Sequence, residues 1–116
     1  MQPPIPYREE RPWGGFVEFT RNKPSSVKII NVSPQQALSL QKHKERDEFW
    51  YVLDGKGFVT KGTEQIPAKS GETYWIPRGT NHRIEATEEV LSVLEISFGT
   101  FDDNDIVRLD DKYGRS

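Results

Sequence analysis

The residues of this chain that could carry chemistry are few and closely grouped. Its only two histidines are His43 and His82, while Gln41 lies two residues before the first of them and Glu48 five residues after it. The sequence contains no cysteine, which excludes disulfides, thiolate-bound zinc and thiol nucleophiles. Any metal must therefore be held by imidazole nitrogen, carboxylate oxygen or amide oxygen.

Strand alternation places the first two candidates together. Residues two apart in a β-strand point to the same side, so Gln41 and His43 share one face. The same alternation turns Leu38 and Leu40 to the opposite face. An outward apolar pair on a strand needs cover from another sheet or subunit, and we therefore expect a homodimer.

The other two candidates reach the same point if their strands are neighbours. Glu48 is an odd step from His43, but the polar segment 44–47 predicts a bend that returns Glu48 to the inner face. His82 begins a later strand, after the turn that contains Gly79. Two imidazoles, one carboxylate and one amide then converge, a set that suits Zn, Fe, Mn, Co or Ni better than Ca or Mg.

A structural interpretation competes with this one. His43 could be exposed within a charged loop, Glu48 could pair with Lys44 or Arg46, and His82 could cap a turn. The metal hypothesis is favoured because the two histidines occupy matching positions in two predicted strands, each of which is flanked by glycines.

The elements that must position these residues are predicted to be strands in a single all-β domain of 116 residues. Prolines at positions 3, 4 and 6 predict an extended arm without ladder hydrogen bonds over residues 1–12. We expect residues 13–100 to form the barrel. Residues 101–116 are predicted to form a C-terminal segment with one helical turn, capped by Asp102 or Asp103. Short apolar or alternating runs predict the strands: FVEFT, VKIINV, ALSLQ, EFWYVLD, GFVTK, ETYWIP, HRIEA and LSVLEISF.

The charge and composition of the chain limit the classes of partner that it can bind. A net charge of -2 and a pI near 5.7 argue against nucleic-acid binding, which normally shows as a basic stripe. No apolar run approaches the ~20 residues that span a bilayer, and the start does not resemble a signal peptide. We therefore expect no membrane partner and a cytoplasmic location.

Two motif groups carry a resemblance to the cupin superfamily, whose fold is a jelly-roll barrel or double-stranded β-helix. The first group contains Gln41, His43, Glu48 and Gly55. The second contains Gly71, Pro77, Gly79 and His82. Three positions depart from the usual pattern, because Gln35 replaces a Gly, Gln41 replaces the first His and Ala86 replaces the closing Asn.

A narrower resemblance covers residues 11–115. The segments RPWGGF, VKIINVSPQQALSLQKHKERDEFWYVLDGKG, YWIPRGTNHRIE, LEISFG and DDNDIVRLDDKYGR resemble the type II mannose-6-phosphate isomerase domain. That domain often forms the C-terminal part of bifunctional mannose-1-phosphate guanylyltransferases. In this family Gln41 is the usual residue, whereas Phe49 stands where a His is usual. These residues include no Gly-rich nucleotide loop, so we expect no nucleotidyl transfer from them.

The resemblance implies interconversion of mannose 6-phosphate and fructose 6-phosphate at a divalent metal, with zinc first and Co, Mn, Ni or Fe as alternatives. Glu48 could act as both ligand and base, and Glu95 is a second candidate base. The sugar phosphate needs cations, for which the candidates are Lys28, Arg46, Arg78 and Arg115, with Arg115 also a catalytic candidate. Each could equally be a solvated surface charge.

Two other functions remain open. A non-catalytic or differently specific cupin that binds a sugar or sugar nucleotide is the first, and Phe49 favours it. An Fe(II)-dependent dioxygenase is the second, because open cupin sites can bind O₂.

Overall fold

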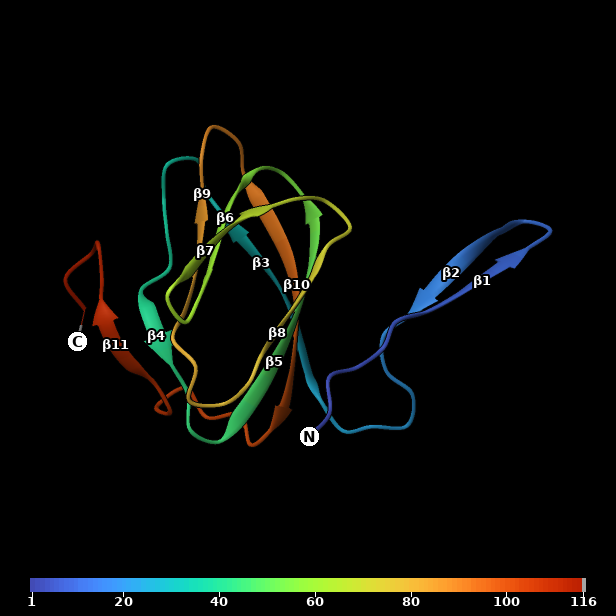
Figure 1. The fold of residues 1–116 in the computed structure, drawn as a ribbon, viewed down its shortest axis with the longest axis horizontal. Helices are drawn as coiled ribbons and strands as arrows, with labels where there is room; N and C mark the ends of the chain where they lie inside the picture. The colour runs from blue at the N-terminus through green and yellow to red at the C-terminus, as the bar shows by residue number, and fades with distance from the viewer. Residues whose placement is uncertain (116) are drawn as a thin grey trace.

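Two antiparallel sheets face each other in the computed structural model, which describes residues 1–115 (Figure 1). One sheet has the spatial order β3 (Ser26–Val32), β10 (Leu91–Gly99), β5 (Arg46–Asp54) and β8 (Thr73–Ile76). The other has the order β11 (Val107–Asp110), β4 (Leu40–Lys42), β9 (His82–Ala86), β6 (Gly57–Lys61) and β7 (Glu64–Ala68). The jelly-roll barrel and the all-β class predicted from sequence are confirmed.

The main core fills the space between the two sheets. It contains fully buried side chains from both inner faces, among them Trp50 and Val52 of β5, Val59 of β6 and Ile84 of β9. Glu48 lies on the same face of β5 as Trp50 and Val52, as the predicted bend requires. The strand alternation of β5 thus places one carboxylate inside an apolar barrel.

A second apolar cluster covers the outer face of the four-stranded sheet. Its buried members are Phe49, Ile96 and Phe98, which alternate with the inward-facing residues of β5 and β10. Phe19 packs on this face, with its ring centroid 5.9 Å from that of Phe49. This sheet is therefore apolar on both sides.

The N-terminal residues differ from the predicted extended arm. Tyr7–Arg11 form β1, which pairs with β2 (Gly14–Glu18) in a hairpin that projects away from the barrel (Figure 1). The prolines keep residues 1–6 out of strands, but the five residues after Pro6 all carry a backbone N–H donor and can form a ladder. The prediction that residues 1–12 lack ladder hydrogen bonds is wrong.

The prediction of a helical turn in the C-terminal segment is also wrong. The Asp102 carboxylate accepts from the backbone N of Asn104 at 2.9 Å, but residues 102–105 form an isolated β-turn rather than a turn of helix. The chain then continues as β11, where Val107 begins a strand paired with β4. Within residues 1–115, no helix has the length and apolar character needed to cross a bilayer.

The position of Leu38 differs from the one that strand alternation predicted. Regular strand β4 starts only at Leu40, so alternation does not extend back to Leu38, which packs against the main core. The outward apolar pair that suggested a homodimer is therefore absent, and any dimer must rest on another surface.

Two turns show why glycines recur in the motifs. At Gly55, with φ of 101°, an added Cβ would lie 2.1 Å from the backbone oxygen of Val90. Gln35 adopts a left-handed φ of 62° at the position where the family usually has Gly, and its N donates to the Thr87 oxygen at 2.8 Å. The turn geometry is kept in spite of the side chain, at a conformational cost.

Candidate metal centre

Three buried side chains from three segments converge inside the barrel. His43 directly follows β4, Glu48 lies on β5 and His82 begins β9. His43 Nε2 lies 3.2 Å from His82 Nε2 and 3.3 Å from Glu48 Oε2, and His82 Nε2 lies 3.7 Å from Glu48 Oε1. All three residues are 2–3% exposed. The sequence prediction that these three meet is matched by this geometry.

Backbone carbonyls fix the protonation of both imidazoles. Nδ1 of His43 lies 2.6 Å from the backbone oxygen of Asp105, and Nδ1 of His82 lies 2.9 Å from that of Thr80. A carbonyl oxygen can only accept, so each Nδ1 carries a proton and donates it. In each neutral ring Nε2 is then unprotonated, and the two Nε2 atoms face each other at 3.2 Å.

The ionisation of the three groups suits a cation. Burial lowers the pKa of His43 and of His82, which favours neutral rings. Burial acts to raise the pKa of Glu48, but the two imidazoles and the hydrogen bond and charge of Arg46 act in the opposite direction and outweigh it, so this pKa lies below its ordinary value. Two lone pairs and a carboxylate facing one another repel unless a positive charge lies between them.

Arg46 supplies positive charge in this arrangement. It is buried, its Nε donates to Glu48 Oε2 at 3.0 Å, and its Nη2 lies 3.1 Å from His43 Nε2. Its guanidinium also lies over the ring of Phe101, with Cζ 4.3 Å from the ring centroid. Arg46 thus uses two of the atoms that a metal would need.

Gln41 faces the same region from β4, where it is the register partner of His82. Its Nε2 donates to Ser39 Oγ at 3.0 Å and to the Ser39 oxygen at 3.3 Å. Because the amide nitrogen is used in this way, Oε1 is the atom available as a ligand. The four residues fit a divalent ion that takes two nitrogen and two oxygen donors.

A cavity of about 250 Å³ opens at these residues. Its other lining residues are Lys28, Ile30, Leu38, Arg46, Trp50 and Glu95. The indole Nε1 of Trp50 donates to Glu48 Oε1 at 3.0 Å, which fixes the carboxylate.

Glu95 is a buried acid in the wall of this cavity. Burial and the nearby charge of Glu48 raise its pKa to about 7, although Lys28 acts in the opposite direction. Lys28 Nζ lies 3.8 Å from Glu95 Oε1, and Ser97 Oγ donates to the same oxygen at 3.2 Å. A carboxyl group with this pKa can both take and give a proton near neutral pH.

Of the four predicted substrate cations, two lie at the cavity and two do not. Lys28 and Arg46 line it. Arg78 is bound to Asp47 through its backbone N at 2.7 Å and its Nη2 at 3.1 Å. Arg115 is paired with Asp111 at 2.9 Å through Nε and Nη2, beside a different pocket.

Phe49, the residue that departs from the family pattern, points away from the metal site. It is adjacent to Glu48 in β5 and therefore faces the outer apolar cluster rather than the cavity. The replacement of His by Phe leaves the inner donor set unchanged.

Two contributors to the site were not among the candidate residues taken from the sequence. Asp105 supplies the carbonyl that orients His43, and its carboxylate accepts from the backbone N of Lys44 and of Glu45, both at 2.9 Å. Phe101 lies under both cavity cations, with Lys28 Nζ 4.9 Å from its ring centroid. Both residues come from the C-terminal segment, whose return to β4 cannot be deduced from alternation.

Comparison with known proteins decides the family. Residues 6–111 match the family described as "Mannose-6-phosphate isomerase C-terminal". The chain belongs to this family. It is 35% identical over 107 residues, 90% of its length, to "Mannose-1-phosphate guanylyltransferase ManC" of Salmonella typhimurium. It spans only 22% of that relative, and less than a quarter of the first curated relatives it matches.

Solved structures agree on a cupin fold. A cupin protein from Bacteroides fragilis superposes with a TM-score of 0.60 at 24% identity, over 66% of each chain. A "putative sugar phosphate isomerase" from Acidithiobacillus ferrooxidans gives a TM-score of 0.60 at 27% identity, over 67% of this chain and 51% of that one. The chain is thus a cupin domain of the sugar-phosphate isomerase type.

Proposed function

We propose that this domain interconverts mannose 6-phosphate and fructose 6-phosphate at a divalent metal bound by Gln41, His43, Glu48 and His82. The observation that carries the proposal is the pair of Nε2 lone pairs 3.2 Å apart beside a buried carboxylate. The family match and the sugar-phosphate isomerase neighbour support the substrate class. Zinc is the cation we propose, with Co, Mn, Ni and Fe as alternatives.

The reaction moves hydrogens without a net change in composition. A proton leaves C2 and a proton is added at C1, while the O2 hydroxyl loses its proton and O1 gains one. A bound divalent cation would act as a Lewis acid that stabilises negative charge developing on the substrate oxygens.

Glu95 is the better of the two candidate bases. Its pKa of about 7 lets it accept the C2 proton and return it at C1. The pKa of Glu48 is lowered, which makes it a weaker base, and its two oxygens already accept from Arg46 and Trp50. We therefore assign proton transfer to Glu95 and charge balance to Glu48.

Lys28 and Arg46 are the cations we assign to the phosphate. Both line the cavity, and both lie over Phe101, so one ring sets the position of two positive charges. The carboxylate partners of Arg78 and Arg115 do not support such a role for them, and their part in binding stays a prediction. A cytoplasmic location is also part of the proposal, in keeping with the absence of cysteine.

The test is to load the protein with Zn, Co, Mn, Ni, Fe or Mg in turn, add mannose 6-phosphate and measure fructose 6-phosphate. We expect turnover with at least one transition metal. Glu95→Gln should reduce kcat about 10²- to 10⁴-fold without changing metal stoichiometry. Glu89→Gln, at an exposed loop position, is the matched control and should keep full activity.

Inactivity with every metal would contradict the isomerase proposal. Binding of the sugar phosphate without turnover would then identify a non-catalytic sugar-binding cupin. Oxygen consumption that requires Fe(II) would instead identify a dioxygenase.

A further inference from the structure

Arg46 lies where the metal ligands and the proposed phosphate site meet. It is only 7% exposed. Its Nε and Nη2 lie at the ligands, 3.0 Å from Glu48 Oε2 and 3.1 Å from His43 Nε2. Its Nη1 donates to the backbone oxygen of Asp102 at 3.3 Å, and its Cζ lies 4.3 Å from the centroid of the Phe101 ring. One guanidinium therefore contacts both the metal ligands and the C-terminal segment.

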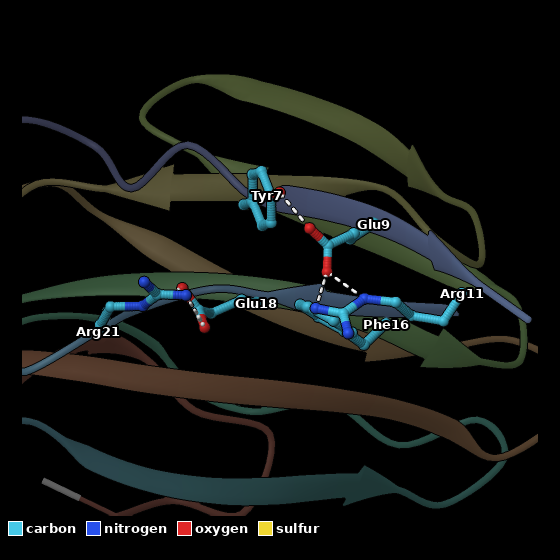
Figure 2. A pocket seen from close by; sticks show the side chains of 6 residues that line it. All are labelled: Tyr7, Glu9, Arg11, Phe16, Glu18 and Arg21. Atoms are coloured by element: carbon cyan, nitrogen blue, oxygen red, sulfur yellow. Dashed lines mark hydrogen bonds and ion pairs between the residues drawn. The ribbon is translucent and has the colours of Figure 1, made fainter. Parts of the chain in front are cut away.

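The ion pair of Arg46 differs from other arginine pairs of this chain. Figure 2 shows two of the others in the pocket along the β1–β2 hairpin, Arg11 with Glu9 and Arg21 with Glu18. Those carboxylates belong to no proposed site, so a bound metal ion would leave both pairs as they are. The carboxylate partner of Arg46 is Glu48, which is also a member of the metal-ligand set. The contacts of Arg46 therefore compete with metal binding.

Arg46 and a metal ion cannot both use Nε2 of His43. The ring proton is on Nδ1, where it is donated to a backbone oxygen, so Nε2 has a single lone pair for either an N–H group or a metal. Two positive charges a few ångströms apart also repel each other, and more strongly in a buried site than in water. Metal binding therefore requires Nη2 to leave His43. Nε can stay on Glu48, because a carboxylate oxygen accepts from more than one partner.

Phe101 holds the released guanidinium at the cavity. A cation over the face of an aromatic ring is attracted to it without the use of any N–H group, so those groups stay free to donate. The Nζ of Lys28 lies 4.9 Å from the centroid of the same ring, which brings a second cation to this place. Arg46 and Lys28 are then both available to one dianion.

We propose that Arg46 is shared between the two sites: it contacts His43 and Glu48 when no metal is bound, and a bound metal ion releases it to the phosphate group of the substrate. The proposal rests on the metal and phosphate assignments of the proposed function. It means that metal and phosphate bind with positive cooperativity, each raising the affinity for the other by the same factor. The metal-free domain then binds the sugar phosphate weakly and does not sequester it.

Sulfate is a suitable probe for this coupling, because it is a tetrahedral dianion like the phosphate group and its zinc salt is soluble. Calorimetric titrations with zinc, without sulfate and with saturating sulfate at constant ionic strength, measure the effect of the anion on the metal. Sulfate titrations of the metal-free and zinc-loaded protein measure the reciprocal effect. Arg46→Gln removes the shared guanidinium. Lys28→Gln is the matched control, because Lys28 contacts Glu95 and Phe101 rather than a metal ligand.

We expect sulfate to raise the zinc affinity of the parent protein at least about fivefold, and zinc to raise the sulfate affinity by the same factor. Arg46→Gln should abolish the coupling. Lys28→Gln should weaken sulfate binding but keep the coupling factor.

An unchanged zinc affinity in the parent protein would overturn the proposal, as would equal loss of the coupling in both variants. Full coupling in Arg46→Gln would also overturn it, since sulfate would then be binding the zinc directly. The experiment requires no turnover, so its outcome is distinct from that of the isomerase assay. Zinc binding without coupling would remove the shared role of Arg46 and leave the isomerase proposal standing.

Discussion

The backbone oxygen of Asp105 lies 2.6 Å from Nδ1 of His43, although 62 residues separate the two in the chain. The same residue holds the loop that follows His43, because its carboxylate accepts from two backbone N–H groups there. One acidic residue of the C-terminal segment therefore sets both the tautomer and the position of a metal ligand.

Asp105→Ala should weaken metal binding by about 10- to 100-fold, the range found when groups that orient ligands are lost. The backbone N–H groups of residues 44 and 45 would lose both carboxylate acceptors. Ala keeps the backbone oxygen that accepts from His43, but the loop contacts that hold this oxygen in place would be lost. Calorimetric titration with zinc measures the change. Asp103→Ala removes a neighbouring exposed carboxylate and should leave affinity unchanged; equal losses in both variants would contradict the assignment.

Arg46→Gln should change metal and substrate binding in opposite directions. The guanidinium now donates to Glu48 and lies against His43 Nε2, so its removal frees two metal ligands. Charge-assisted hydrogen bonds contribute about 1.5 to 3 kcal/mol, so zinc affinity should rise by about 10- to 100-fold. The KM for mannose 6-phosphate should rise, because Arg46 is one of the two cationic side chains that we assign to the phosphate group.

Lys44→Gln, which removes an exposed positive charge two residues away, separates these effects from a general change in charge. It should alter neither zinc affinity nor KM. A lower zinc affinity in Arg46→Gln would show that Arg46 supports the metal rather than competing with it.

Asp47 should stabilise the protein near neutral pH and lose this effect in acid. Burial raises its pKa, but the hydrogen bonds and charge of Arg78 outweigh this, so the pKa lies below its ordinary value. A carboxyl group whose pKa is depressed in the folded state stabilises the protein above its unfolded-state pKa, and that contribution is lost as pH falls through the folded pKa.

Thermal unfolding of the parent and of Asp47→Asn between pH 7 and pH 2 tests this. The parent should have the higher Tm at pH 7, and the two midpoints should converge in strong acid. A constant difference across this range would contradict the assignment, since it would show that the ionised form of Asp47 has no special stability.

Gln35→Gly should stabilise the protein. A non-glycine residue in the left-handed region costs about 1 to 2 kcal/mol, while glycine loses about 0.5 to 1 kcal/mol more in chain entropy. The net gain in the free energy of unfolding is therefore roughly 0.5 to 1 kcal/mol, measurable by urea denaturation. Gln35→Ala keeps the positive φ of 62° and should show no gain; similar values for Gly and Ala would exclude strain as the cause.

Much of the barrel and its ligand set followed from alternation. Period-two patterns predicted the strands that contain Glu48 and His82, and the polar residues before β5 predicted the bend that turns Glu48 inward. Alternation failed where no regular strand exists, as at Leu38, which packs inward just before β4. It also could not predict long-range pairing, such as β11 with β4, that brings Asp105 to His43.

Charged residues were the hardest to place from sequence. Local sequence did not separate Lys28 and Arg46, which line the cavity, from Arg78 and Arg115, which do not. The carboxylates that bind the other two, Asp47 and Asp111, become neighbours through strand and turn geometry. A phosphate site therefore depends on tertiary contacts that sequence spacing does not encode.

The central claim is most directly tested by a crystal structure of the zinc-loaded protein with anomalous diffraction data at the zinc edge. We predict one peak per chain, about 2.0 to 2.2 Å from Nε2 of His43, Nε2 of His82 and a carboxylate oxygen of Glu48. A fully loaded crystal with no peak between these three residues, or with its zinc bound elsewhere, would contradict the account.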